Sequence, residues 1–543
     1  MRRSVPPTVL GTIFATAGLL LALSGCGGGT PSVNPPPPLT MSTTSLPTGI
    51  AHLVYGGATL QATGGVKPYN WAVTTGILPP GLALNGTTGA ISGTATTAGT
   101  SSFTVAVSDS ETPTAKTATA NLSITITSKI KHVVVIFQEN RTPDNLFQDP
   151  ILISRGADIA QSGVNSQGQT VPLSPVGLGI NYDLSHSHAE FVKMCDLNSV
   201  TGQCRMDGAP TTPNSAFVYV NPSDVQPYFH LAEQYTFGDR MFQTNQGPSF
   251  PAHQFIISGT SAPSVGSTSF AAENPSSGGG RGTGCIASST EYVTLIDPSG
   301  SESKQMYPCF EHPTLTDELD VKGVSWHYYT PSPRSIWTGP NAIEHMCGPN
   351  APPPNATECV GSIWVNNVVI KETQVLIDIN SNALPEVSWV IPTGLNSDHP
   401  GNTRATGGPS WVAAIVNAIG NSPYWADTAI FITWDDWGGW YDHVAPKLIN
   451  SYEYGFRVPL IVVSPYAKAG YISHATHDFG SILNFIEETY GVPSLGYADA
   501  LADDLSDGFD FSQTPIAFQS VSAPLDAAYF LNYTGPRTDP DDD

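Results

Sequence analysis

Runs of apolar residues between polar loops dominate the second part of the chain. Four of them have the length of buried strands: Val133–Phe137, Val387–Ile391, Ala429–Trp434 and Leu460–Val463. A continuous β-branched run of this length is typical of a strand buried on both faces, as in a parallel sheet. Apolar residues recur at helical spacing over Trp411–Ile419 and Ser481–Tyr490. The pattern predicts an α/β domain.

A different pattern covers residues 39–128, where Thr, Ser, Gly, Ala and Val prevail. Short alternating segments such as Ser102–Ser108 lie between frequent turn signals, which predicts a small all-β sandwich. Three of its segments, Tyr69–Trp71, Leu78–Leu82 and Ile91–Thr94, resemble those of immunoglobulin-like domains on bacterial surface proteins. We find no catalytic constellation here and expect a spacer or adhesion module.

The N-terminus has the layout of a secretory signal. Two arginines precede the short apolar segment Val9–Leu23, which ends in Leu-Ser-Gly-Cys26. This ending resembles a bacterial lipobox, in which the cysteine is lipidated and becomes the new N-terminus. A plain signal peptide and a membrane helix are the alternatives. We therefore expect a signal over residues 1–26 and a Gly/Pro linker over residues 27–38. The protein would be exported to the cell envelope, as an outer-membrane lipoprotein or on the cell surface, with membrane contact through Cys26.

Composition supports export. The 543 residues carry a net charge of -24 with only 12% charged residues, together with 52 Gly and 47 Pro. The negative charge argues against nucleic acid as a partner, and no obligatory protein partner is evident. Apart from Cys26, six cysteines remain, an even number that implies disulfides in an exported protein. Neighbours in sequence suggest the pairs Cys195–Cys204, Cys285–Cys309 and Cys347–Cys359, although six cysteines allow many other pairings.

Polar residues follow two of the predicted strands. Glu139 and Asn140 come directly after the first, and Asp435 and Asp436 after the third. Ligand sites in open α/β sheets lie outside the carboxyl ends of the strands. Adjacent carboxylates are costly to bury unless a cation neutralises them. An all-oxygen set of this kind suits a hard divalent cation, of unknown identity. The alternative is a solvated strand end and an acidic turn.

Ser249 lies in a tight Gly-Pro-Ser-Phe-Pro turn before an apolar segment. At a helix N-terminus its hydroxyl would stand where backbone amides favour an anion such as phosphate. The alternative is a simple helix cap.

Histidines are the fourth candidate group. The one that directly follows a buried strand is His399, with Asp398 beside it. His186 competes with His188 for one role, and His345 lies in a separate loop. His443 and His474 are expected near the site, outside the first layer of contacts.

These residues together carry a family resemblance. KHVVVIFQENRTPDNLF is similar to the opening of the bacterial phosphoesterase family that contains phosphatidylcholine-type phospholipase C and a respiratory-burst-inhibiting acid phosphatase. Thr142 and Pro143 replace the Ser and Phe of that family. FGDRMFQTNQGPSFPAHQF, SWVIPTGLNSDHP and ITWDDWGGWYDHVAP resemble its later segments. The resemblance covers roughly residues 130–511.

The resemblance implies an alkaline-phosphatase-like fold, a central and mostly parallel sheet flanked by helices, over residues 130–515, followed by a tail over residues 516–543. It implies Ser249 as nucleophile, forming a phosphoserine intermediate on a phosphomonoester or a phospholipid. One divalent metal ion would be held by Glu139, Asn140, Asp435, Asp436 and Ser249. His399, His345 and His186 would act on the substrate oxygens or the leaving group. No organic cofactor is implied.

Two other functions compete with an acid phosphatase or phospholipase C. A non-catalytic surface protein would bind or adhere through the immunoglobulin-like domain, which the intact set of site residues argues against. A sulfatase would need an Arg in the segment that starts at Ser249, and SFPAH lacks it.

Overall fold

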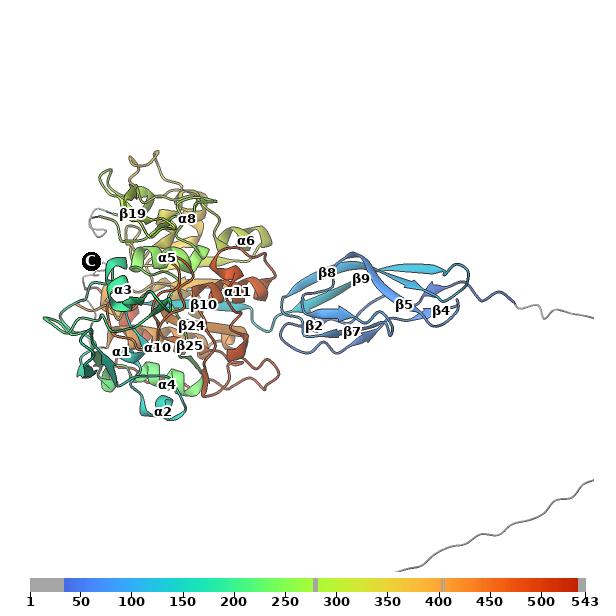
Figure 1. Cartoon of the computed structure of the whole chain (residues 1–543), viewed down its shortest axis with the longest axis horizontal. Coiled ribbons are helices and arrows are strands. Elements are labelled where there is room, and N and C mark those ends of the chain that lie inside the picture. Colours follow the sequence, from blue (N-terminus) through green and yellow to red (C-terminus); the bar gives the residue numbers. More distant parts are fainter. Residues whose placement is uncertain (1–33, 277–281, 402–403, 405, 536–543) are drawn as a thin grey trace, which may run out of the picture.

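The computed structural model describes residues 34–276, 282–401, 404 and 406–535. These residues form a small all-β body and a larger α/β body, joined end to end (Figure 1). The expected signal segment Val9–Leu23 and lipidation site Cys26 lie outside the described residues.

The small body is a two-sheet sandwich. One sheet has the order β2-β9-β8-β5, with β2 (Gly49–Ile50), β9 (Thr117–Thr127), β8 (Gly99–Ser108) and β5 (Asn70–Gly76). The other has the order β3-β7-β6, with β3 (Ala58–Thr59), β7 (Ala90–Gly93) and β6 (Leu82–Leu84). Side chains alternate along β8, so that Phe103, Val105 and Val107 point into a core shared with Trp71 and Ile91. The predicted all-β sandwich is confirmed.

One eight-stranded sheet organises the large body. Its strands lie in the order β22 (Val368–Ile370), β21 (Trp326–Thr330), β23 (Val387–Val390), β10 (His132–Gln138), β24 (Thr428–Trp434), β25 (Leu460–Val463), β17 (Thr236–Gly238) and β26 (Tyr471–Ser473). The first five run parallel, whereas β25 is antiparallel to both of its neighbours. All four predicted strands are present, and β24 is buried along its whole length.

Helices cover both faces of this sheet. On one face α5 (Ser249–Ser258) packs beside α11 (Phe479–Tyr490), and on the other α10 (Gly407–Gly420) contacts α4 (Gln226–Gln234) and α9 (Gln374–Asn380) (Figure 1). The predicted helices at Trp411–Ile419 and Ser481–Tyr490 are therefore confirmed as parts of α10 and α11. The fold class expected from the sequence, mixed α/β with an N-terminal sandwich, is also confirmed.

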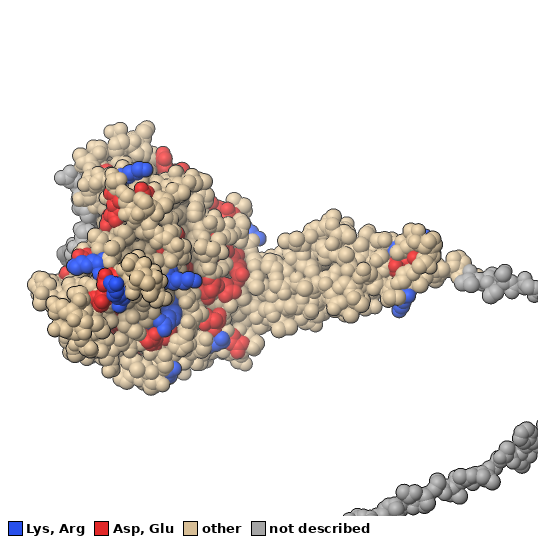
Figure 2. All heavy atoms as spheres, viewed as in Figure 1, with Lys and Arg blue, Asp and Glu red and all other residues tan. Residues whose placement is uncertain are grey.

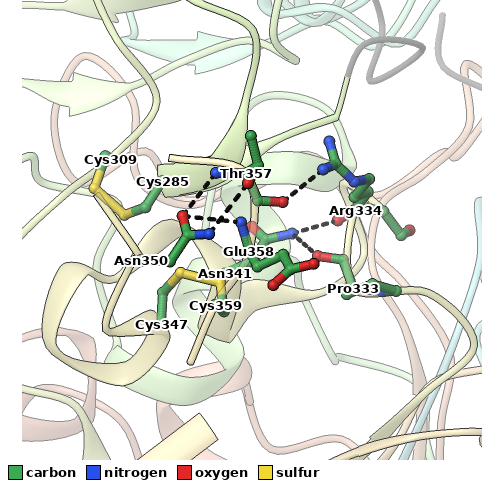
Figure 3. The surroundings of a disulfide bond; sticks show 11 residues. Cys285, Cys309, Pro333, Arg334, Asn341, Cys347, Asn350, Thr357, Glu358 and Cys359 are labelled. Atoms are coloured by element: carbon green, nitrogen blue, oxygen red, sulfur yellow. Dashed lines mark hydrogen bonds between the residues drawn. A yellow bond between two sulfur atoms is a disulfide. The ribbon is translucent and has the colours of Figure 1, made fainter. Parts of the chain in front are cut away.

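Three disulfides join the cysteine pairs suggested by the sequence: Cys195–Cys204, Cys285–Cys309 and Cys347–Cys359. The last two lie in one small apolar cluster (Figure 3). Beside them the Asn350 side chain accepts a hydrogen bond from the Thr357 amide at 2.9 Å. The sequence separations are 9, 24 and 12 residues, so each crosslink closes a local segment of the chain.

Among the described residues, no helix combines the length and the apolar character that a membrane crossing requires.

The two bodies meet at the C-terminal end of α11. The Ala98 amide donates to the Glu488 carbonyl at 2.9 Å. His52 stacks on Phe511, and its Nε2 lies 3.6 Å from the Glu488 carboxylate. Acidic side chains gather on the large body beside this junction, while the sandwich is almost free of charge except at its far tip (Figure 2). Burial, together with the charge of Asp504, raises the pKa of Glu488 to about 7.

This raised pKa predicts a pH-dependent stability. Between about pH 4.5 and 7 the folded state binds a proton on Glu488 that the unfolded chain has lost, so folding stability falls as the pH rises through that window. Glu488→Gln removes the titration. We expect its melting temperature to exceed that of the wild type by about 1–2 °C at pH 8 and to differ less at pH 5.

The matched control is Glu344→Gln at an exposed position. A melting-temperature difference for Glu488→Gln that does not change between pH 5 and pH 8 in calorimetry would refute this account of the junction.

Candidate active site

The candidate site forms at the carboxyl ends of the two central strands. β10 and β24 pair in parallel with Gln138 opposite Trp434. The residues after each strand therefore emerge side by side, and the Asp435 amide donates to the Gln138 carbonyl at 3.0 Å. This register brings Glu139 and Asn140 to the same edge of the sheet as Asp435 and Asp436.

Backbone amides fix the orientation of the Asp435 carboxylate. Its Oδ1 accepts from the amides of Asn140 at 2.9 Å and of Asp436 at 2.7 Å. Asn140 has a left-handed backbone, with φ of 58°, which asparagine tolerates better than most residues. Gly438 packs against it, since a Cβ there would lie 2.5 Å from the Asn140 carbonyl oxygen. Asp435 Oδ2 is left without a hydrogen-bond donor.

Ser249 stands at the start of α5, fully buried. The N-cap position is Pro248, and the alternative role of Ser249 as a simple cap is therefore wrong. The Ser249 hydroxyl lies 3.4 Å from Asp436 Oδ2, to which it donates. Of the first-turn amides, only that of Ser249 stays open to an anion among the described residues, because the Phe250 amide donates to Asn274 Oδ1 at 2.9 Å and Pro251 has no N–H.

His186 orients the Asn140 amide. The Nδ1 of His186 donates to the Leu184 carbonyl at 2.8 Å, which leaves Nε2 as an acceptor for the Asn140 Nδ2 at 3.1 Å. The Asn140 Oδ1 then has no donor and is buried. His186 Nε2 also lies 3.9 Å from Asp436 Oδ2.

His399 lies next to His186, with ring centroids 6.3 Å apart, and stacks at a tilt on Trp337. Its Nδ1 donates to the Pro400 carbonyl at 2.8 Å. Its Nε2 lies 3.8 Å from the carboxylate of Asp183. Sequence reasoning missed Asp183, although it stands only three residues before His186.

Arg141 ties the first strand end to the His399 loop. Its guanidinium donates twice to the Asp398 carbonyl, at 2.9 and 2.7 Å, and lies over the Trp440 ring. Asp398 accepts hydrogen bonds from Tyr228 and from the Trp434 indole. Burial raises the pKa of Asp398 to about 6.

His253 is a site residue that sequence reasoning missed. It lies one helical turn after Ser249 on α5, and its buried Nε2 is 3.3 Å from Glu139 Oε1. Ligand atoms of Glu139, His253 and Asp435 all lie within 4.8 Å of one another. Burial lowers the pKa of His253 to about 4, so the ring is neutral at pH 7. The i, i+4 spacing from Ser249 was the signal available in the sequence.

The other candidate histidines have partners away from this cluster. His345 lies 2.8 Å from Glu311 and 3.2 Å from Asp317, and its described contacts do not include Ser249 or the strand-end carboxylates. His188 pairs with Glu302, so of the two competing histidines only His186 contacts Asn140. His443 bridges Asp144 and Asp158, and His474 contacts Asp239.

Three buried carboxylates that have no lysine or arginine partner among the described residues define the electrostatics of the site. Glu139, Asp435 and Asp436 are fully buried, and in the described part of the chain no Lys or Arg forms an ion pair with them. Burial, and then the charge of Asp435, raises the pKa of both Glu139 and Asp436 well above the usual range. Glu139 Oε2 and Asp435 Oδ2 have no donor. A divalent cation fits this donor set.

A large cavity lies elsewhere. It has a volume of about 780 Å³, begins beyond the C-terminal end of α5 at Thr260, and is lined by Phe242, Ile449 and Tyr497 among others. None of the strand-end carboxylates and neither Ser249 nor His253 lines it. The buried polar cluster, and not the cavity, therefore marks the candidate chemistry.

Comparison with known proteins identifies the family. The model of the Phosphoesterase family matches residues 130–493, about two thirds of the chain. The chain belongs to this family. The enzyme class expected from the sequence, a phosphoric ester hydrolase, is thereby confirmed. A second family model, for an Ig domain, matches residues 30–127.

Individual relatives are distant. Non-hemolytic phospholipase C of Pseudomonas aeruginosa is 23% identical over 437 residues, which cover 70% of this chain and 57% of that protein. Phospholipase C A of Mycobacterium tuberculosis is 24% identical over 453 residues, covering 73% of this chain and 80% of that protein. The chain thus spans little more than half the length of the Pseudomonas protein.

Among solved structures, a protein in the alkaline phosphatase superfamily from Vibrio parahaemolyticus aligns over 73% of this chain and 72% of its own. The identity is 12% and the TM-score is 0.32. A likeness of this degree carries no argument about function.

Proposed function

We propose that this phosphoesterase hydrolyses phosphate esters by nucleophilic attack of Ser249 on phosphorus, on an alkaline-phosphatase-like domain. The observation that carries the proposal is the contact of Ser249, at the N-terminus of α5, with Asp436, whose neighbour Asp435 accepts from the Asn140 amide of the other strand end. Glu139, Asn140, Asp435, Asp436 and Ser249 would hold one divalent ion. When bound, such an ion lowers the pKa of the serine hydroxyl and neutralises charge on the phosphoryl oxygens.

Ser249 supplies the nucleophile and the substrate the leaving group. The Ser249 Oγ forms a bond to phosphorus while the ester P–O bond breaks, which gives a phosphoserine and an alcohol. The Ser249 amide and the positive end of the α5 dipole favour the negative charge of the phosphoryl group. Water then breaks the Ser249–phosphorus bond and releases phosphate or a phosphorylated headgroup.

A histidine would donate the proton that the leaving group needs. In both His186 and His399, Nδ1 donates to a backbone carbonyl, so Nε2 is the atom that exchanges a proton. We assign His399 as general acid, because Asp183 beside its Nε2 stabilises the protonated ring. His186 orients Asn140 and lies near Asp436. His345 stays an assignment from the family resemblance, without contact to these groups in the structure.

Two substrate classes fit this chemistry. The names of the relatives, phospholipase C, favour a phospholipid. Serine as the nucleophile resembles the acid phosphatase branch, which acts on phosphomonoesters. The alternative of a non-catalytic adhesion protein gains no support from a site in which nucleophile, carboxylates and histidines converge.

Removing the nucleophile gives the first test. Ser249→Ala should lower kcat on p-nitrophenyl phosphate or phosphatidylcholine by about 10³-fold or more, because the variant lacks the hydroxyl that forms the phosphoenzyme. Ser258→Ala, the same change at the other end of α5, is the matched control and should keep wild-type activity. Chelation should abolish activity, and one added ion should restore it.

Full activity of Ser249→Ala would overturn the nucleophile assignment. Wild-type protein inactive on both substrates would overturn both versions of the function.

We also propose that Cys26 is lipidated and anchors the exported protein to the membrane of the cell envelope. Cys26→Ser should move the protein from the membrane fraction to the soluble fraction and prevent incorporation of labelled fatty acid. A variant that stays in the membrane fraction after a salt wash would contradict the anchor.

A further inference from the structure

The two ring nitrogens of His253 face different partners, and the contact of Nε2 with a carboxylate needs an explanation. The side chain is fully buried, edge-on to Phe137 and stacked on Trp337. Its Nδ1 lies 3.3 Å from the Tyr328 hydroxyl, and its Nε2 lies 3.3 Å from Glu139 Oε1. Which nitrogen carries the proton decides what Nε2 can bind.

The hydrogen bonds of Tyr328 fix the proton of His253. The Tyr328 hydroxyl donates its single hydrogen to the Trp337 carbonyl at 2.8 Å. Towards the other side its oxygen can only accept, from the Gly339 amide and from His253. His253 Nδ1 must therefore carry the hydrogen and donate it to Tyr328.

This tautomer turns the Nε2 lone pair towards carboxylate oxygens. Glu139 Oε1 is 3.3 Å away, and a carboxylate oxygen of Asp435 lies within 4.8 Å. The lone pair of Nε2 and those of the carboxylate oxygens repel each other unless a proton or a cation lies between them. The second oxygens of Glu139 and Asp435 are buried and have no donor either.

The arrangement around His253 is that of a metal-bound histidine. Such a ring donates its other N–H to an oxygen, which fixes its tautomer and orientation. Here Tyr328, itself held by the Trp337 carbonyl, supplies that oxygen. The i, i+4 spacing on α5 places His253 and Ser249 on the same face of the helix.

We propose that His253 Nε2 is a ligand of the ion at this site, which makes the donor set mixed nitrogen and oxygen. The inference rests on the proposed function, which places an ion at this site. It replaces the all-oxygen ligand set expected from the sequence. An all-oxygen set suits Mg²⁺ or Ca²⁺, whereas an imidazole ligand selects a first-row transition ion such as Zn²⁺ or Fe²⁺. We therefore assign a transition ion to the site.

Metal binding to the purified full chain tests this directly, without reference to activity. After removal of metal by a chelator, the wild type should bind Zn²⁺ in titration calorimetry much more tightly than Mg²⁺. His253→Asn keeps a donor towards Tyr328 but loses Nε2. It should weaken Zn²⁺ binding more than about ten-fold and change Mg²⁺ binding little.

His253→Gln is a second variant in case the first does not fold, and His327→Gln, at a half-buried histidine that contacts Tyr329, is the matched control. Loading with Co²⁺ gives a spectroscopic readout, because the visible absorption of the ion reports its ligands. We expect the spectrum to change in either folded His253 variant and to stay unchanged in His327→Gln.

The wild type alone can also refute the proposal. Pulsed EPR of the Cu²⁺-loaded protein, with and without ¹⁵N-labelled histidine, detects a bound imidazole nitrogen. No histidine coupling, or equal Zn²⁺ affinity in the wild type and a folded His253 variant, would overturn the nitrogen ligand. Neither result would affect the Ser249→Ala test, and a failed Ser249→Ala test would leave the metal measurements valid.

Discussion

The burial of three carboxylates at one edge of the sheet is the constraint on which the rest of the site depends. Glu139, Asp435 and Asp436 are removed from water, with no lysine or arginine pairing with them in the described residues. The effective cost of burying an unpaired ion is on the order of several kcal/mol. Either protonation or a counter-charge must neutralise such a cluster, and a bound divalent ion is the counter-charge that this donor set fits.

The surrounding fold holds this cluster in place. Parallel pairing of β10 with β24 brings the two strand ends together, and backbone amides fix one oxygen of Asp435. The left-handed backbone of Asn140 and the close approach of Gly438 turn the chain sharply after each strand. Arg141 then links the first strand end to the loop that carries His399. The proposed metal ligands, nucleophile and acid thus share one support.

Much of this arrangement could be predicted from the sequence because it follows local rules. Apolar runs located the four strands, and the polar residues directly after them located Glu139, Asn140, Asp435 and Asp436. The pairing of the six cysteines followed from their proximity along the chain. Short strands such as β17 and the aromatic β21 escaped, since three residues or a run of tyrosines carry no clear period.

What could not be predicted depends on tertiary contacts. His253 is one of several histidines in the sequence, and only the packing of α5 against β10 places it beside Glu139. His345 was expected to act on the substrate, yet its ring lies against Glu311 and Asp317. The choice between His186 and His188 likewise depends on which side of the loop faces Asn140.

The most direct test of the central claim is anomalous diffraction from crystals of the full chain grown with the ion that restores activity. The account predicts one anomalous peak between the carboxylates of Glu139, Asp435 and Asp436, within coordination distance of Asn140 Oδ1. Fully active crystals with no peak there, or with the ion bound only at another place, would contradict it.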